Sequence, residues 1–339
     1  MSEGYVVAVC GATGAVGREM VEVLAERDFP VRSLRLFASE RSEGEKIAFR
    51  GQEVEVRRLT EDAFEGVDLA LFSAGSEVSR HFAPIAARSG AVVVDNSSAW
   101  RMDPEVPLVV PEVNPEDLAG YEAKGIVANP NCSTIQLVVA LSPLHRAAGL
   151  TQVRVSTYQS VSGAGQKGIE ELSEQTRRLF NSLDVEARCF PHRIAFNLIP
   201  QIDVFEDSGY TREEMKMVRE TRKILHAPDL PVSATCVRVP VFFGHSESVA
   251  LSTREPLAPE TAREILAAAP GVKVLDAPEE QVYPMPLLAS GDDATLVGRI
   301  RRDLIDPNGL ELFVVADNVR KGAATNAVQI AECLAAEHL

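Results

Sequence analysis

The sequence predicts an α/β protein with two domains: a doubly wound parallel sheet, followed by an α+β domain with a mixed or antiparallel sheet. Three observations predict this class. The chain has 339 residues, more than one hydrophobic core usually supports. Its first half alternates short apolar runs with helical patterns, which is typical of a parallel sheet covered on both faces. Its second half holds longer segments in which apolar and polar residues alternate.

The N-terminal segment predicts a dinucleotide-binding turn. An apolar strand at residues 5–10 is followed by Gly11, Gly14 and Gly17 and then by an amphipathic helix at residues 18–27. Small residues let the backbone approach a pyrophosphate, and the helix N-terminus attracts its charge. A tight strand-to-helix turn without a ligand is the alternative. Further buried strands are predicted at residues 31–38, 68–72 and 91–95, which completes a Rossmann-type sheet.

The end of the second predicted strand indicates which dinucleotide binds. NAD-preferring domains carry an acidic residue there, which binds the ribose hydroxyls. Here the small residues Ala38 and Ser39 are followed by Glu40 and Arg41. Room and positive charge favour a ribose phosphate and therefore NADP, although Glu40 weakens this argument. The alternative is a solvated loop whose charges bind nothing specific.

The most informative segment is residues 129–134, where Pro130 is expected to begin a long apolar helix that carries Cys132 in its first turn and that Gly149 ends. The unpaired N–H groups of a first helical turn favour negative charge and stabilise a thiolate. Cys132 is therefore a candidate nucleophile. The other four cysteines lack such a helix start, and packing is the ordinary role of a cysteine.

The second domain begins near residue 151, with strands predicted at 151–159, 235–243 and 295–300. A glycine-rich turn follows Gln159, whose amide would reach a reacting carbonyl unless the turn is an ordinary hairpin. Alternation places Arg238 opposite its valine neighbours, as either a surface cation or a carboxylate clamp. His245 has a side chain whose usual pKa, about 6.5, suits proton transfer, and a structural histidine is the alternative.

Composition excludes several classes of protein. The net charge of −15 would repel nucleic acid and anionic membranes, so a few local cations must bind any anionic substrate. No apolar run reaches membrane-spanning length and no secretory signal is evident, so we expect a cytoplasmic protein. Five scattered cysteines without paired spacing predict a reducing compartment and no metal site.

These motifs together resemble the aspartate-semialdehyde dehydrogenase family over essentially the whole chain. The matching segments occur in the family's order, at residues 11–17, 72–75, 94–98, 109–114, 129–134, 162–165, 236–240 and 245–248. The resemblance implies NADPH-dependent reductive dephosphorylation of L-aspartyl 4-phosphate to L-aspartate 4-semialdehyde through a cysteine thioester. This step leads toward lysine, threonine, methionine and diaminopimelate.

The resemblance also implies roles for individual residues. Cys132 would be the nucleophile, His245 the general acid/base and Gln159 the group that orients the acyl substrate. The substrate-binding set would be Arg101 and Lys216 for phosphate, Arg238 for the α-carboxylate and Glu213 for the ammonium. The cofactor set would be Gly11, Thr13, Gly14, Ala15, Val16, Arg41, Ser42, Ser162, Gly163 and Asn318.

We expect an NADP-binding domain over residues 1–129, with a C-terminal helix within 317–339 packing back on it. Residues 130–316 would form the catalytic and dimerisation domain of a homodimer or a dimer of dimers. Two alternatives stay open. An N-acetyl-glutamyl-phosphate reductase performs the same chemistry, but its blocked nitrogen would give Glu213 no ammonium to bind. A non-catalytic NADP-binding regulatory protein is the other.

Overall fold

The chain divides into two compact units in the computed structural model, which describes residues 4–338. Unit 1 comprises Met1–Asn131 and Ala323–Leu339, and unit 2 comprises Cys132–Gly322. Each unit contains one sheet. Unit 2 is thus a single insertion into the sequence of unit 1.

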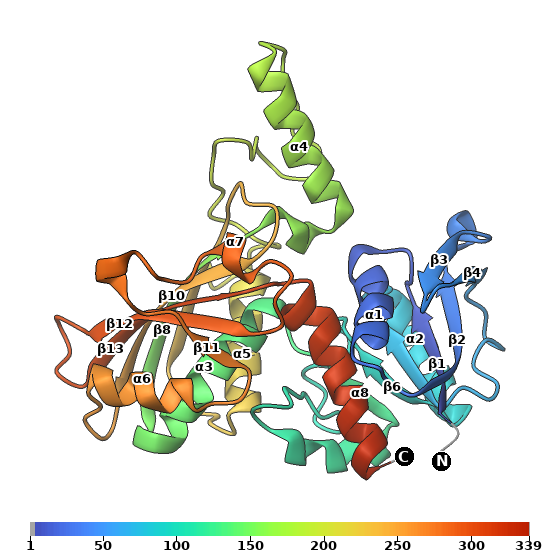
Figure 1. The fold of residues 1–339 in the computed structure, drawn as a ribbon, viewed down its shortest axis with the longest axis horizontal. Helices are drawn as coiled ribbons and strands as arrows, with labels where there is room; N and C mark the ends of the chain where they lie inside the picture. The colour runs from blue at the N-terminus through green and yellow to red at the C-terminus, as the bar shows by residue number, and fades with distance from the viewer. Residues whose placement is uncertain (1–3, 339) are drawn as a thin grey trace. The chain divides into compact units, whose positions relative to one another are not determined.

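Unit 1 contains a seven-stranded sheet in the order β3-β4-β2-β1-β5-β6-β7 (Figure 1). All neighbouring strands are parallel except β3 and β4, which pair antiparallel. The order reverses beside β1, where β2 lies on one side and β5 on the other, and ligands of such sheets bind at this point. The strands are β1 Tyr5–Cys10, β2 Val31–Ala38, β3 Lys46–Phe49, β4 Gln52–Arg58, β5 Leu69–Phe72, β6 Val92–Asp95 and β7 Ile126–Ala128.

Helices cover the central strands of unit 1, and for this reason β1, β5 and β6 are almost continuously buried and apolar. Helix α8 packs against α1, and both contribute to one core cluster with these strands. The helices are α1 Ala15–Glu26, α2 Ser76–Arg88 and α8 Thr325–Glu337, and the 3-10 segments are η1 Glu40–Ser42 and η2 Pro115–Ala123.

Unit 2 contains a six-stranded mixed sheet in the order β11-β12-β13-β10-β8-β9. Strand β10 pairs antiparallel with both β8 and β13, whereas β8 and β9 are parallel. This confirms the predicted mixed sheet. The strands are β8 Leu150–Gln159, β9 Val232–Arg238, β10 His245–Thr253, β11 Val272–Val274, β12 Thr295–Arg302 and β13 Gly309–Ala316.

Helix α3 packs on this sheet and is buried along most of its length, whereas α4 stands away from the sheet (Figure 1). The helices of unit 2 are α3 Cys132–Ala148, α4 Gln166–Phe180, α5 Arg212–Ile224, α6 Pro259–Ala267 and α7 Pro286–Ala289. The shorter turns are η3 Val161–Ala164, η4 Pro278–Glu280 and the π-helical η5 Arg320–Ala324. None of the helices between residues 4 and 338 has the length and apolar character needed to cross a bilayer.

Two local predictions need correction. The helix expected to begin at Pro130 begins at Cys132 instead. The strand expected over residues 235–243 ends at Arg238, because Pro240 has no N–H group with which to continue the ladder. Along this strand the buried face carries Cys236 and Arg238, whereas Val237 is only partly buried. The surface-cation interpretation of Arg238 is therefore wrong.

Candidate active site

Cys132 is the first residue of α3, so its side chain lies at the end of the helix where backbone N–H groups are exposed. The predicted placement of this thiol at a helix start is confirmed. Gly322 lies directly beside Cys132. A Cβ atom added to Gly322 would be only 2.9 Å from Cys132 Cβ. Only a residue without a side chain leaves room for the cysteine there.

Two of the other cysteines lie in buried positions that suppress ionisation. Cys10 and Cys236 are fully buried, and burial raises the pKa of both thiols strongly. Cys189 is an exposed residue. The partial burial of its thiol, and then the negative charge of Glu171, raise the pKa of that thiol. Partly exposed at a helix start, Cys132 has the environment expected of a nucleophile.

His245, the first residue of β10, is completely buried. Its Nδ1 atom accepts a hydrogen bond of 3.1 Å from the backbone N–H of Ser160. We therefore assign the neutral ring its proton on Nε2. No residue between 4 and 338 hydrogen-bonds this Nε2 atom, so it is available to a bound group. Burial, and then the charge of Arg238, hold the pKa of His245 well below its usual range, which keeps the ring neutral.

Asn318 connects the turn after β8 to the start of β10. Its Oδ1 atom accepts hydrogen bonds from the hydroxyls of Ser160 and Ser162, at 3.0 and 3.1 Å, and from the backbone N–H of Gly244 at 3.0 Å. This network holds the backbone that positions His245. The structure thus shows an internal role for Asn318 and Ser162, while their contact with the cofactor stays a prediction.

Arg238, the last residue of β9, is buried with 7% of its surface exposed. Its Nη1 atom donates to the carbonyl of Ser160 at 2.6 Å, and its guanidinium lies over the ring of Phe190, 5.8 Å from the centroid. A Cβ atom on Gly163 would lie 2.8 Å from Arg238 Nη1 and 3.2 Å from His245 Nε2. Arg238 and His245 therefore both lie beside Gly163, which leaves space between them because it has no side chain.

Helix α5 presents Glu213 and Lys216 on its first turns. The helix begins at a capping box, in which Thr211 and Glu214 bond reciprocally. Gln159 Nε2 donates to Glu213 Oε1 at 3.4 Å, and Lys216 Nζ lies 3.0 Å from Glu213 Oε2. Burial lowers the pKa of Lys216, but the charges of Glu213 and Asp203 outweigh it, so that the pKa is raised overall and the side chain is charged.

Unit 2 thus brings six predicted site residues into one cluster. Arg238 interacts electrostatically with both Glu213 and Cys132. Burial lowers the pKa of Arg238 overall, whereas the charges of Glu213 and then Cys132 act to raise it. The six residues are Cys132, Gln159, Glu213, Lys216, Arg238 and His245, from α3, β8, α5, β9 and β10.

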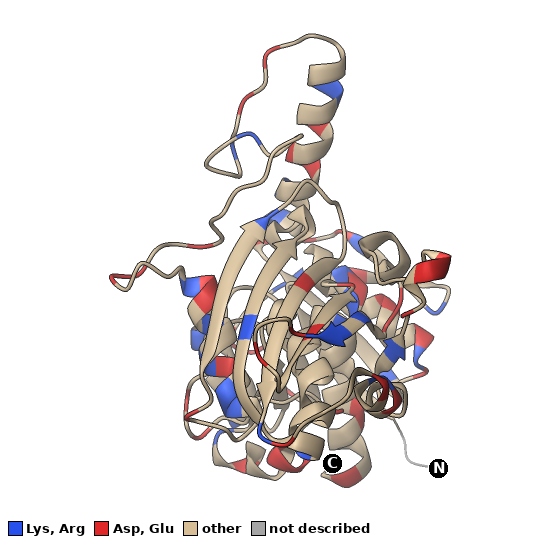
Figure 2. Cartoon of the chain, turned by 90° about the vertical axis from the view of Figure 1, so that its left-hand side faces the viewer, with Lys and Arg blue, Asp and Glu red and all other residues tan. Residues whose placement is uncertain are grey.

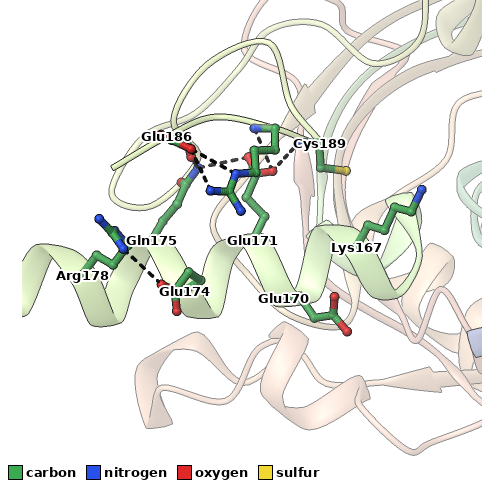
Figure 3. A pocket seen from close by; sticks show the side chains of 9 residues that line it. Lys167, Glu170, Glu171, Glu174, Gln175, Arg178, Glu186 and Cys189 are labelled. Carbon is green, nitrogen blue, oxygen red and sulfur yellow. Dashed lines mark hydrogen bonds and ion pairs between the residues drawn. The ribbon is translucent and has the colours of Figure 1, made fainter. Parts of the chain in front are cut away.

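Helix α4 holds the segment that carries Phe190, over whose ring the Arg238 guanidinium lies. Figure 3 shows Glu171 of α4 beside Cys189 of this segment. Glu171 Oε2 accepts the backbone N–H groups of Arg188, at 3.0 Å, and of Cys189. The side chains that line the pocket beside them carry charges of both signs, as in the ion pair of Arg178 with Glu174. Phe190 was not among the predicted site residues, because nothing in its local pattern marks a contact with a residue 48 positions later in the chain.

Unit 1 carries the glycine turn, and its geometry fits a dinucleotide. Gly11 has φ of +85°, and a Cβ atom there would lie 2.5 Å from the carbonyl oxygen of Ser73. A Cβ atom on Gly17 would lie 2.1 Å from the carbonyl oxygen of Gly11, so both positions require glycine. Gly14 precedes α1, and a Cβ atom there would lie no closer than 3.4 Å to its nearest neighbour, the carbonyl oxygen of Gly11. The helix start is therefore accessible to a phosphate group.

The predicted ribose-phosphate residues lie next to this turn in unit 1. The Thr13 hydroxyl donates to the Ser42 hydroxyl at 3.3 Å, which connects the glycine turn to η1. Glu40, the residue that weakened the NADP prediction, pairs with Arg58 at 3.4 Å. The side chain of Arg41 is exposed. Glu40 is thus partly neutralised, which favours a phosphate at this position.

Arg101 is buried in unit 1 and held by backbone carbonyls. Its Nε atom donates to Asn129 at 2.9 Å, and its Nη2 atom donates to Asn96 at 2.9 Å. Asn129 Nδ2 in turn donates to Asn96 Oδ1 at 2.7 Å. The guanidinium therefore has a fixed orientation, as a phosphate ligand requires.

Family models match most of the chain. Residues 6–121 match the semialdehyde dehydrogenase NAD binding domain, and residues 141–321 match the semialdehyde dehydrogenase dimerisation domain. A dinucleotide-binding sheet combined with a cysteine, histidine and arginine cluster defines an oxidoreductase of the semialdehyde dehydrogenase class.

Individual relatives specify the family. Aspartate-semialdehyde dehydrogenase of Aquifex aeolicus is 59% identical over 99% of both chains, and that of Bacillus subtilis is 53% identical over 98% of both. The crystal structure of aspartate semialdehyde dehydrogenase II from Vibrio cholerae, complexed with ASA, has a TM-score of 0.98 and 52% identity over 100% of both chains. The chain belongs to the aspartate-semialdehyde dehydrogenase family, as the sequence motifs predicted. A more distant structure, the Candida albicans enzyme with NADP, has a TM-score of 0.76 and 26% identity over 98% of this chain and 99% of that one.

Proposed function

We propose that the protein catalyses the NADPH-dependent reductive dephosphorylation of L-aspartyl 4-phosphate to L-aspartate 4-semialdehyde. The observation that carries this proposal is the cluster in unit 2, where a thiol at a helix start shares its surroundings with a neutral imidazole and a buried guanidinium. This combination suits acyl transfer to sulfur followed by reduction of the thioester.

In the first step, the Cys132 thiolate attacks the acyl carbon of the substrate. A carbon–sulfur bond forms, the bond to the phosphate oxygen breaks, and a thioester remains. The backbone N–H groups of the first turn of α3 stabilise the oxyanion. Gln159, held by Glu213 at 3.4 Å, orients the acyl group.

In the second step, the thioester is reduced. Bound NADPH supplies the hydride for this reduction. Collapse of the resulting thiohemiacetal forms the aldehyde and returns the electron pair to the sulfur of Cys132. His245 holds a proton at Nε2, the ring atom without a hydrogen-bond partner in residues 4–338. It donates this proton to the reacting oxygen as the thioester is reduced and takes it back when the thiohemiacetal collapses, so the ring is neutral again at the end.

The charges of the cluster match the substrate. Arg238 binds the α-carboxylate through its planar fork, Glu213 binds the ammonium, and Lys216 and Arg101 are phosphate ligands. Glu213 and Lys216 pair with each other at 3.0 Å. When the substrate binds, its ammonium can take the place of Lys216 beside Glu213, and its phosphate can take the place of Glu213 beside Lys216. An N-acetylated substrate lacks the ammonium and would leave Glu213 uncompensated.

For the cofactor we propose NADP, with the pyrophosphate at Gly11, Gly14 and the start of α1 and the ribose phosphate at Arg41 and Ser42. The close contacts at Gly11 and the pairing of Glu40 with Arg58 support this assignment. Thr13, Ala15, Val16, Ser162, Gly163 and Asn318 stay candidate cofactor contacts. We further propose that the protein works in the cytoplasm as a homodimer formed through unit 2, or as a dimer of dimers. The match of residues 141–321 to a dimerisation domain supports the dimer.

The test is the reverse reaction, phosphate-dependent reduction of NADP, measured with L-aspartate 4-semialdehyde and with N-acetyl-L-glutamate 5-semialdehyde. We expect turnover with the first substrate. Cys132→Ala should abolish turnover yet bind NADPH normally, and Cys189→Ala should keep activity as the matched control. Preference for the acetylated substrate would identify the reductase alternative. A folded protein without either activity would favour the regulatory one.

A further inference from the structure

Glu247 is a buried acid that the mechanism above does not use. It lies on β10 two residues after His245, so both side chains belong to the same face of the strand, and its exposed fraction is 0%. Figure 2 shows charged residues mainly on helices and loops, whereas the long strands are largely uncharged. An acid at the centre of this sheet therefore needs a physical explanation.

No lysine, arginine or histidine side chain in residues 4–338 hydrogen-bonds to the carboxyl oxygens of Glu247. Its cross-strand neighbours are Thr157 on β8 and Val314 on β13. Neither carboxyl oxygen accepts a well-aligned hydrogen bond from any residue between 4 and 338. The titratable groups around it are the neutral His245 and the Cys236 thiol on β9, whose pKa is raised by burial and, less strongly, by Glu213, Glu214 and Glu247.

The side chain that interacts with Glu247 is Gln136 of α3. Gln136 is fully buried one helical turn after Cys132, and its Nε2 atom donates to the carbonyl oxygen of His245 at 3.2 Å. Because Nε2 is used in this way, Oε1 is left as an acceptor, and no group in residues 4–338 donates to it. Three neighbouring buried oxygens thus lack a donor, which costs free energy at each one.

We propose that Glu247 is protonated in the native enzyme and donates its carboxyl proton to Gln136 Oε1, which fixes the His245 backbone against the helix that carries Cys132. One proton turns an unsatisfied acceptor into a donor and completes the chain from Glu247 through Gln136 to the carbonyl of His245. Glu247 is then a positioning residue. Burial raises the pKa of its carboxyl well above the usual range and outweighs the contact with Gln136, which by itself would lower that pKa.

Neutrality at Glu247 also has a consequence for the imidazole. A carboxylate on the same face as His245 would favour the imidazolium and oppose the burial and the Arg238 charge that keep the ring neutral. A protonated carboxyl fixes the same backbone without this electrostatic effect.

This inference rests on the proposed function for its kinetic test, so the first measurement is independent of activity. Infrared difference spectra of wild type and Glu247→Gln should contain the carbonyl band of one protonated carboxylic acid, present at neutral pH in wild type only. A protein that shows this band but no turnover would contradict the proposed function and leave the protonation intact. Absence of the band would overturn the protonation.

The kinetic test compares three variants. Glu247→Gln keeps a neutral donor, so we expect kcat within about threefold of wild type and an unshifted pH profile of kcat/KM. Glu247→Leu and Gln136→Met each break the hydrogen-bond chain from Glu247 to the carbonyl of His245. We expect kcat to fall about tenfold to a hundredfold, the range for displacement of a reacting group by about 1 Å. The double variant Glu247→Leu, Gln136→Met should lose no more than either single variant, because both remove one interaction.

A merely structural acid would give different results. If Glu247 acts as a carboxylate, Glu247→Gln removes a negative charge near His245, and the acidic limb of the profile moves to lower pH together with a loss of kcat. That outcome would overturn the proposal. If Glu247→Leu does not fold, Gln136→Met provides the same comparison, and wild-type kcat in Gln136→Met would equally contradict it.

Discussion

Gly163→Ala probes the most closely packed point of the candidate active site. The added methyl carbon would lie 2.8 Å from Arg238 Nη1 and 3.2 Å from His245 Nε2. Ordinary contacts begin at 3.4 Å, so the guanidinium must move by about 3.4 − 2.8 = 0.6 Å. Gly163 does not have a positive φ, so alanine causes no backbone strain of its own.

The magnitude follows from what Arg238 is proposed to bind. A displacement of this size breaks the alignment of one of the two hydrogen bonds that a planar fork makes to a carboxylate. A hydrogen bond to a charged group contributes about 1.5–3 kcal/mol, and 1.4 kcal/mol corresponds to a factor of ten. We therefore expect kcat/KM for L-aspartate 4-semialdehyde to fall about tenfold to a hundredfold at saturating NADP and phosphate.

The assay requires two controls. Gly163 is also a candidate cofactor contact, so the dissociation constant for NADPH is measured separately by fluorescence titration. If the variant binds the cofactor more weakly, the NADP concentration in the assay is raised until it is saturating again. Gly120→Ala in η2 is the matched variant, because a Cβ atom there meets nothing within 4 Å. Wild-type kcat/KM in Gly163→Ala would refute the placement of Arg238 and His245 on either side of this residue.

The remaining predictions concern the clamp, the glycine turn and the imidazole. Arg238→Lys keeps the charge but loses the fork, so KM for the semialdehyde should rise at similar kcat; unchanged kinetics would contradict the clamp. Gly17→Ala should lower the unfolding temperature, because its Cβ would meet the Gly11 carbonyl at 2.1 Å, whereas Gly14→Ala should fold normally and weaken NADPH binding. Imidazole nitrogen NMR should show His245 neutral, with Nε2 protonated, below the ordinary pKa of about 6.5, since burial disfavours the charged ring. A signal that titrates near 6.5 would disprove this.

Features encoded in short segments could be predicted from the sequence. Strands β5 and β6 lie within the predicted residues 68–72 and 91–95, because a buried parallel strand reads as a nearly continuous apolar run. The glycine turn and the helix start at Cys132 were predictable for the same reason: each depends on neighbouring residues. Motif resemblance then added the family and the identity of the residues that unit 2 brings together.

Features that depend on tertiary packing could not be predicted in this way. Arg238 alternates with valines, so period-two reasoning gives its face but not which face is buried. The antiparallel hairpin of β3 and β4 was missed, because these strands carry charged residues on exposed positions. Glu247 is a polar residue within an alternating strand, and only the folded structure shows that it is buried without a hydrogen-bond partner among residues 4–338.

The contact between Cys132 and Gly322 also constrains how the gene can vary in length. These residues are the first and last of unit 2, so its two ends meet at the reactive sulfur. A deletion or duplication of even one codon in either connecting segment would displace the thiol. The β12–β13 tip, where Leu304 and Ile305 are almost fully exposed, should by contrast accept added residues. A scan of single-codon insertions should therefore find both connections intolerant and this tip permissive.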